Sequence, residues 1–172
     1  MAQLATLNEF ESMRKIGISI DAEEYENVEA LPISEQSLMH KAIAARENAY
    51  APYSKFQVGA AVLLEGAILV TGNNQENAAY PSGMCAERVA IWKATSSHPK
   101  KKIIAIAISA TSKLTEVSKP VGPCGACRQT LSEYEVRQKE PFSLLFMGAK
   151  GPVIKVFSIK SLLPFSFDAS YL

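Results

Sequence analysis

The sequence is short of several kinds of residue, and each shortage excludes a class of protein. Lysine and arginine total 18 against 17 acidic residues, so a net charge of +1 leaves no cationic excess for binding nucleic acid. No apolar run reaches the roughly 18 residues that cross a membrane, because Glu65 interrupts the longest one, residues 58–70. The first residues show no basic patch followed by an apolar stretch, so no secretory signal is expected. We therefore expect a cytoplasmic protein with neither a nucleic-acid partner nor a membrane partner.

Cysteine and histidine are scarce as well. The three cysteines, Cys85, Cys124 and Cys127, are an odd number in a chain with no visible export signal. A disulfide framework is therefore not expected, and clustered thiols in a reducing compartment more often bind a metal or take part in catalysis. The two histidines, His40 and His98, are interpreted as surface or packing residues. The chain also lacks the glycine-rich and phosphate-loop motifs of enzymes that use nucleotide cofactors.

What is present is a hydrophobic fraction of 48% in 172 residues, enough for the core of one ordinary domain. Ser34 is a plausible helix N-cap, and the helix that follows should end near Tyr50 because Pro52 disfavours helix before it. The patterns along the rest of the chain predict an α/β fold with a mixed sheet of about five strands and helices on both faces. Predicted strands cover residues 57–64, 67–71, 103–109, 142–147 and 153–158, and predicted helices cover residues 34–50, 83–95, 123–134 and a short turn near 161.

Residues 1–33 differ from the rest of the chain and are predicted to form an acidic arm in front of a main domain, residues 34–172. The arm carries seven acidic residues and ends at Leu31-Pro32. Within it, residues 15–21 alternate apolar and polar side chains with period two, which is typical of a half-buried strand. We favour an extra edge strand or an intersubunit arm over a flexible tail.

The three cysteines have the spacing of a metal site. Cys124 and Cys127 form a Cys-x-x-Cys pair at a predicted helix start, and Cys85 lies 39 residues upstream at another. Three thiolates would occupy three corners of a zinc tetrahedron, and no histidine is well placed to supply the fourth ligand. The fourth position is therefore expected to hold water, and an open position marks a catalytic rather than a structural zinc site.

Charged residues beside the cysteines suit such a site. Three thiolates on Zn²⁺ leave about one negative charge, which would weaken the acidifying effect of the metal on water. Arg88 follows Cys85 by three residues on the same helix face and is expected to moderate that charge, whereas Arg128 is as well explained by a surface contact. Glu87 points away from the ligand direction, so it could lie beside the water and carry protons. On its own, a solvated first-turn glutamate stabilised by the helix dipole would explain Glu87 better.

These motifs resemble the zinc-dependent cytidine deaminase family. The resemblance rests on Cys-Ala-Glu-Arg at residues 85–88 and Pro-Cys-Gly-Ala-Cys-Arg-Gln at residues 123–129, and it extends from Ser34 to the end of the chain. Residues 51–61 and 72–80 further resemble the small homotetrameric nucleoside branch. The resemblance implies a three-layer α/β/α fold and one Zn²⁺ per subunit, held by the three cysteines. The arm and a long loop at residues 110–122 depart from the family pattern.

The resemblance also implies where a nucleoside binds. Asn74 and Glu76 would hydrogen-bond the ribose 3′-hydroxyl, and a buried carboxylate there would repel a nucleotide. Phe56 would lie against the base, and the backbone N–H of Ala86 would bind the base carbonyl. Turn formation and core packing are the alternative explanations for Asn74, Glu76 and Phe56.

Two further aromatic residues are implied to act between subunits. Tyr80 is similar to a residue that reaches the sugar from an adjacent protomer. Phe167, whose spacing fits better than that of Phe165, would stack on the pyrimidine in a neighbouring subunit. The active sites of the tetramer would then be shared, although two aromatics near a terminus can also simply anchor a tail.

The predicted activity is hydrolytic deamination of cytidine and deoxycytidine to uridine and deoxyuridine plus ammonia, a step of pyrimidine salvage. Zinc would lower the pKa of its bound water, and Glu87 would act first as the base and then as the acid. Three alternatives stay open: a sibling deaminase acting on blasticidin-type nucleoside antibiotics, a zinc-fold module without catalysis, and a thiol–disulfide oxidoreductase based on Cys124 and Cys127. The last needs no zinc and makes Cys85 dispensable.

Overall fold

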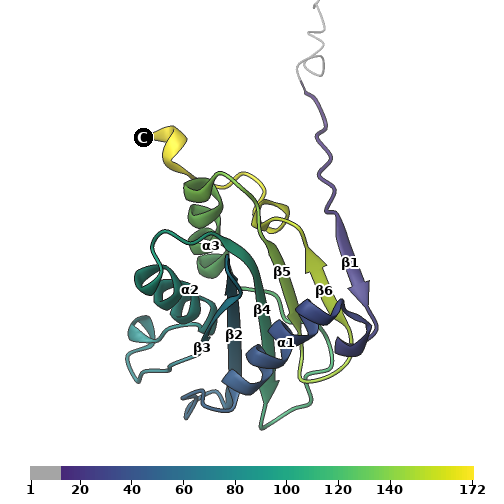
Figure 1. Cartoon of the computed structure of the whole chain (residues 1–172), viewed down its shortest axis with the longest axis vertical. Coiled ribbons are helices and arrows are strands. Elements are labelled where there is room, and N and C mark those ends of the chain that lie inside the picture. Colours follow the sequence, from purple (N-terminus) through teal and green to yellow (C-terminus); the bar gives the residue numbers. More distant parts are fainter. Residues whose placement is uncertain (1–12) are drawn as a thin grey trace, which may run out of the picture.

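A computed structural model describes residues 13–172, in which one twisted sheet lies between helices (Figure 1). The predicted α/β fold is confirmed, with six strands rather than about five. The strands are β1 (Ala22–Tyr25), β2 (Phe56–Leu64), β3 (Ile68–Asn73), β4 (Ile103–Ser112), β5 (Ser143–Met147) and β6 (Val153–Val156). The helices are α1 (Ile33–Arg46), α2 (Ala86–Ser97) and α3 (Gly125–Gln138), with 3₁₀ turns at Val28–Ala30, Tyr80–Ser82, Ile159–Leu162 and Ala169–Tyr171.

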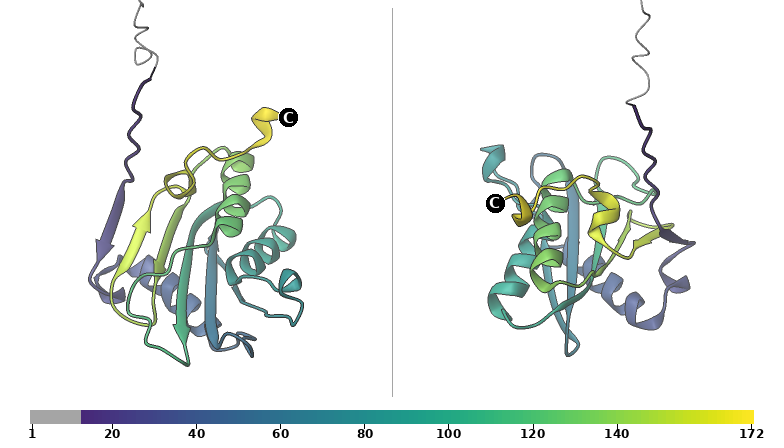
Figure 2. Two further views of the ribbon diagram at one scale, coloured as in Figure 1. Left: turned by 180° about the vertical axis from the view of Figure 1, so that it is seen from behind. Right: turned by 90° about the horizontal axis from the view of Figure 1, so that it is seen from above.

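The strand order across the sheet is β1-β6-β5-β4-β2-β3. Only β4 and β5 run parallel, and all other neighbours are antiparallel. The chain returns from β4 to β5 through α3, as a parallel pair requires a crossover. Figure 2 shows α1 on one face of the sheet and α2 with α3 on the other.

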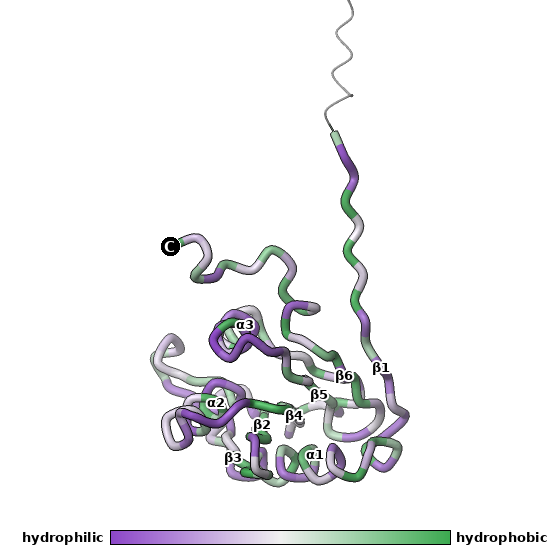
Figure 3. The backbone as a smooth tube through the Cα atoms, turned by 45° about the horizontal axis from the view of Figure 1, so that its top comes forward, coloured by the Kyte–Doolittle hydropathy of each residue, from purple (hydrophilic) through white to green (hydrophobic). Residues whose placement is uncertain are grey.

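Each face of the sheet buries its own apolar core, so the strands read as nearly continuous hydrophobic runs. The core beneath α1 contains Leu38 and Met39, and the core beneath α2 and α3 contains Ile91 and Leu131. In Figure 3, green marks hydrophobic residues along the central strands between the helices. Among residues 13–172, no helix combines the length and the hydropathy needed to span a bilayer.

Two glycines in the sheet let helices come unusually close. A Cβ at Gly59 of β2 would lie 2.1 Å from the carbonyl oxygen of Ala42 in α1. A Cβ at Gly72 of β3 would lie 2.5 Å from the backbone nitrogen of Ala90 in α2. Both helices therefore rest directly on strand backbone, which fixes the depth at which α2 sits.

Residues 15–21, predicted as a half-buried strand, are exposed and form no strand within the chain. The edge strand is β1, which pairs with β6 from Ala22↔Val156 to Tyr25↔Val153. Residues 13–21 continue from it without strand pairing, because β6 ends at Val156 and Ser158 caps the next turn. The arm prediction also covers residues 1–12, which lie outside the described residues.

Other element boundaries differ from the predictions by a few residues. Helix α1 has Pro32, not Ser34, at its N-cap and ends at Arg46, because Tyr50 is already bridged to Gln75. Helix α2 starts at Ala86 rather than at residue 83, because Met84 bridges to the other side of Gln75. Helix α3 runs on to Gln138, and the last predicted helix is the short 3₁₀ turn Ile159–Leu162.

Candidate active site

The three cysteines converge at the starts of two helices. Cys85 is the N-cap of α2, Cys124 is the N-cap of α3, and Cys127 lies in the first turn of α3. Their sulfur atoms all lie within 4.8 Å of one another, and those of Cys85 and Cys124 are 4.0 Å apart. Tetrahedral zinc with Zn–S bonds near 2.3 Å requires sulfurs about 3.8 Å apart, so the cluster fits the metal. A thiol–disulfide site would have left Cys85 apart from the pair.

Positive electrostatic potential at this point favours thiolates. The N-termini of α2 and α3 both face the cluster, and the Arg88 Nη2 lies 3.5 Å from the Cys85 sulfur. A hydrogen bond from Cys127, together with Arg88, lowers the pKa of Cys85 to about 5. The same shared hydrogen bond, followed by burial, raises the pKa of Cys127. Without a metal ion, ionisation of one thiol therefore disfavours ionisation of the other. A divalent cation would stabilise all three thiolates together.

Glu87 lies in the first turn of α2 with its side chain turned inward. It is only 5% exposed, which is unusual for a glutamate. Burial raises the pKa of its carboxyl group, and the negative charge of Cys85 adds to this effect. In the described part of the chain, the sulfur cluster that could hold an ion does not include this carboxylate. Glu87 therefore lies on the cavity wall beside the three sulfurs without belonging to their cluster.

A cavity of about 740 Å³ opens onto the cluster. Every residue that the sequence assigned to the site lines this cavity, except Cys127, which is buried behind it, and Phe167. The predicted lining residues are Phe56, Asn74, Glu76, Tyr80, Cys85, Ala86, Glu87, Arg88 and Cys124. Its volume is in the range of pockets that enclose small organic ligands.

Asn74 and Glu76 both hold the segment that leads into β2. The Asn74 side chain accepts a hydrogen bond from the Val58 N–H at 2.8 Å and donates one to the Phe56 carbonyl at 2.9 Å. The Glu76 carboxylate accepts hydrogen bonds from the Tyr53 N–H at 2.8 Å and from the Ser54 N–H and hydroxyl. The Ser54 hydroxyl is the main reason that the pKa of Glu76 is lowered. The cavity wall that carries Phe56 is thus fixed through these two side chains.

Sequence analysis missed Tyr53 and Ser54 as lining residues. Both lie in the turn after Pro52, and the Tyr53 and Tyr80 rings stand 6.4 Å apart at the cavity rim. Ser54 also accepts a hydrogen bond from the Phe56 N–H at 3.0 Å. From the sequence, residues 51–61 indicate only a resemblance to a family. The hydroxyl two residues before Phe56 was a usable signal, since serine commonly bonds the backbone two residues on.

The C-terminal segment lies outside the cavity. Phe165 and Phe167 are both exposed, and the Phe167 ring stacks on Tyr171 at 5.6 Å. Arg128 donates to the carbonyls of Pro123 at 2.8 Å and Leu162 at 3.0 Å. Arg128 therefore ties the loop before Cys124 to the C-terminal segment, which is a structural role and not the charge-moderating alternative.

Comparison with known proteins agrees with this geometry. The family model for the cytidine and deoxycytidylate deaminase zinc-binding region matches residues 32–139. The cytidine deaminase of Halalkalibacterium halodurans is 41% identical over 134 residues, which cover 78% of this chain and 94% of the relative. The crystal structure of cytidine deaminase from Burkholderia pseudomallei superposes with a TM-score of 0.66 at 37% identity, covering 76% of this chain and 97% of that one. The Mycobacterium tuberculosis cytidine deaminase structure gives a TM-score of 0.59 at 28% identity, covering 80% and 99%.

Proposed function

Because this chain belongs to the cytidine and deoxycytidylate deaminase zinc-binding family, we propose that it hydrolyses cytidine and deoxycytidine to uridine and deoxyuridine with release of ammonia. The observation that carries the proposal is the buried Glu87 carboxyl beside three convergent sulfurs on the wall of one cavity. Cys85, Cys124 and Cys127 would hold zinc through three protein ligands, and catalytic zinc sites typically have three protein ligands.

The chemistry divides between the metal and one carboxyl group. When bound, zinc supplies a Lewis-acidic centre at which water becomes a nucleophile near neutral pH. Glu87 accepts a proton from the attacking water and delivers it to ring N3 while the oxygen adds to C4. It then carries the remaining hydroxyl proton to the amino group, which leaves as ammonia when the C4 carbonyl forms. Burial raises the pKa of the Glu87 carboxyl group, which makes it a stronger proton acceptor than an ordinary glutamate and suits it to take up the protons that it later returns.

We assign the remaining cavity residues to recognition of a free nucleoside. Asn74 keeps one amide proton and one oxygen lone pair beyond its backbone bonds, and Glu76 keeps lone pairs as well, so both could hold the 3′-hydroxyl. Phe56 would lie against the base, and the Ala86 N–H would bind its carbonyl. Arg88 is the only cation among the lining residues and is engaged with Cys85, which disfavours a phosphorylated substrate.

We further propose a homotetramer in which neighbouring chains complete each site. Tyr80 is 77% exposed at the rim of its own cavity, and Phe167 is 58% exposed outside it. Such aromatic residues rarely stay uncovered in a working assembly, so contact with an adjacent subunit would explain both. A site of three reduced thiols also suits the cytoplasm.

One assay on one purified sample tests the proposal. Zinc content should equal one ion per chain, and cytidine absorbance should fall with stoichiometric release of ammonia. A protein with one zinc ion that releases no ammonia from cytidine or deoxycytidine would overturn the assignment and favour a non-catalytic zinc module. Turnover of a blasticidin-type nucleoside in preference to cytidine would instead identify the sibling activity.

A further inference from the structure

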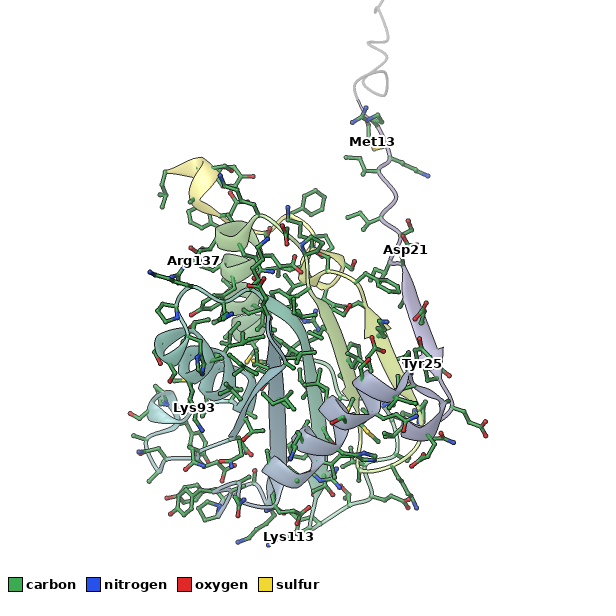
Figure 4. All side chains as sticks on the ribbon, viewed as in Figure 1. Met13, Asp21, Tyr25, Lys93, Lys113 and Arg137 are labelled. Carbon is green, nitrogen blue, oxygen red and sulfur yellow. The ribbon has the colours of Figure 1, made fainter. Side chains whose placement is uncertain are left out.

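Residues 13–21 leave the sheet edge as an extended segment (Figure 4, from Met13 to Asp21). Its base is firmly held, because β1 pairs with β6 along its whole length. On one face of this pair, the Lys155 ammonium lies 2.8 Å from the Glu35 carboxylate and 3.9 Å from that of Glu23. The segment therefore departs in the direction that β1 sets, away from the rest of the chain (Figure 1).

The segment carries an apolar stripe that nothing in residues 13–172 covers. Ile16, Ile18 and Ile20 are 66%, 54% and 51% exposed, and small residues separate them. Side chains two apart lie on one face of an extended chain, so the three isoleucines form a continuous apolar surface. β1 is also the terminal strand of the sheet, so its outer edge has backbone groups free to pair.

The sequence of this segment is complementary to itself. When two copies run antiparallel about a two-fold axis at Ile18, Ile16 faces the Ile20 of the other copy and Ile18 faces itself. In the same register Lys15 faces Asp21, so opposite charges meet at both ends of the ladder. A shift of the axis by one residue, to Ser19, would place Ile16 opposite Ala22 and draw Lys15 to Glu23, which Lys155 already contacts.

We propose that residues 15–21 form an intersubunit strand that pairs antiparallel with the same residues of a second copy of this chain, with its two-fold axis at Ile18. The pairing joins two sheets through the segments that precede β1 and shields the isoleucines by cross-strand contact. It goes beyond the proposed catalytic function, because no residue that lines the cavity belongs to this segment.

Cysteine crosslinking tests the register in zinc-loaded, full-length protein. Ile18→Cys places two thiols opposite each other across the axis, so mild oxidation should yield a covalent dimer on a non-reducing gel. Ser19→Cys is the matched control, because residue 19 faces Gly17 in this register and should crosslink far less. Equal crosslinking of the two variants, or crosslinking of Ser19→Cys alone, would overturn the proposed pairing.

A charge exchange tests the same contact without new cysteines. Lys15→Glu and Asp21→Lys each place like charges opposite each other at both ends of the ladder. Each should raise the dissociation constant of the arm contact about tenfold in analytical ultracentrifugation, and the double variant should restore it. Lys119→Glu, on an exposed loop outside the arm, makes the same charge change and should have no effect. Single variants that associate like the unaltered chain, or a double variant that stays dissociated, would refute the pairing.

Discussion

Two glutamates of this protein are buried to the same extent and have opposite environments. Glu87 on α2 and Glu135 on α3 are each 5% exposed. The Glu135 carboxylate accepts hydrogen bonds from the Phe142 N–H at 3.1 Å, the Ile159 N–H at 2.9 Å and the Ser158 hydroxyl at 2.6 Å. Within residues 13–172, the hydrogen bonds to the Glu87 carboxyl group come from its own backbone N–H and from the Cys127 thiol, and burial raises its pKa.

The difference shows that burial alone does not make a catalytic acid. With its three hydrogen-bond donors, the Glu135 carboxylate links α3 to the residue before β5 and to the turn after β6. A buried carboxyl group with few donors can change its protonation state at modest cost, which proton transfer requires. The first arrangement stabilises the fold, whereas the second suits the proton transfer that we propose for Glu87.

The largest expected effect follows from removing the ionisable group in the cavity. Glu87→Gln keeps the shape of the side chain but cannot carry protons, so kcat for cytidine should fall by at least about 10²–10⁴-fold. Zinc content should stay at one ion per chain, because the cluster that could hold the ion consists of the three cysteines and does not include Glu87. Steady-state kinetics and metal analysis measure both. A variant with near-normal kcat would contradict the role of Glu87.

The same substitution at Glu135 should lower the stability of the fold. Glu135→Gln leaves one oxygen for the Phe142 and Ile159 N–H groups but replaces the oxygen that accepts from the Ser158 hydroxyl by an amide donor, so the free energy of unfolding should fall by about 1–3 kcal/mol. Urea unfolding measures this fall, and kcat should change little in the folded enzyme. Glu133→Gln, at an exposed position of the same helix, is the control that should leave stability unchanged. If Glu135→Gln abolished kcat without loss of stability, the contrast would fail.

A smaller loss is expected when one donor is removed instead of the acceptor. Ser158→Ala leaves Glu135 with its two backbone donors, so the free energy of unfolding should fall by about 1 kcal/mol. Part of this loss comes from the cap that Ser158 gives to the Lys160 N–H at 3.1 Å. The same urea titration measures it, and a loss equal to that of Glu135→Gln would show that the hydroxyl is the dominant donor.

The smallest effect extends the comparison to Glu76, a partly buried glutamate at the cavity wall. The hydrogen bond from Ser54 keeps the pKa of Glu76 below its ordinary value, so the carboxylate stays ionised until the pH falls through that lowered pKa. Ser54→Ala should raise this pKa and move the acid limb of kcat/KM for cytidine to higher pH. The KM should rise more than kcat falls. A pH profile unchanged from that of the parent enzyme would argue against a role for the Glu76 anion in binding.

Sequence analysis could predict the metal cluster because its information is local. Two helix starts with cysteines, together with Glu87 and Arg88 at fixed offsets from Cys85, define the site before any tertiary contact is known. The hydrogen bonds of Glu135 could not be predicted. Their donors, Phe142, Ser158 and Ile159, come from other segments of the chain and share no motif with Glu135.

The position of the edge strand could not be predicted from the sequence either. Alternation at residues 15–21 specifies an extended chain with one apolar face, but not where its pairing partner lies. The four residues that do pair, Ala22–Tyr25, owe their strand to β6, which is more than 120 residues away in the sequence.

Gly72 in β3 affects the zinc site although it lies 13 residues before Cys85 in the sequence. A methyl group there would lie 2.5 Å from the Ala90 nitrogen and 3.0 Å from the Ala86 carbonyl oxygen, so α2 would have to lift away. Cys85 caps that helix whereas Cys124 caps α3, so any lift would part the two sulfurs. The absence of a side chain at Gly72 therefore helps to set the distance between the Cys85 and Cys124 sulfurs.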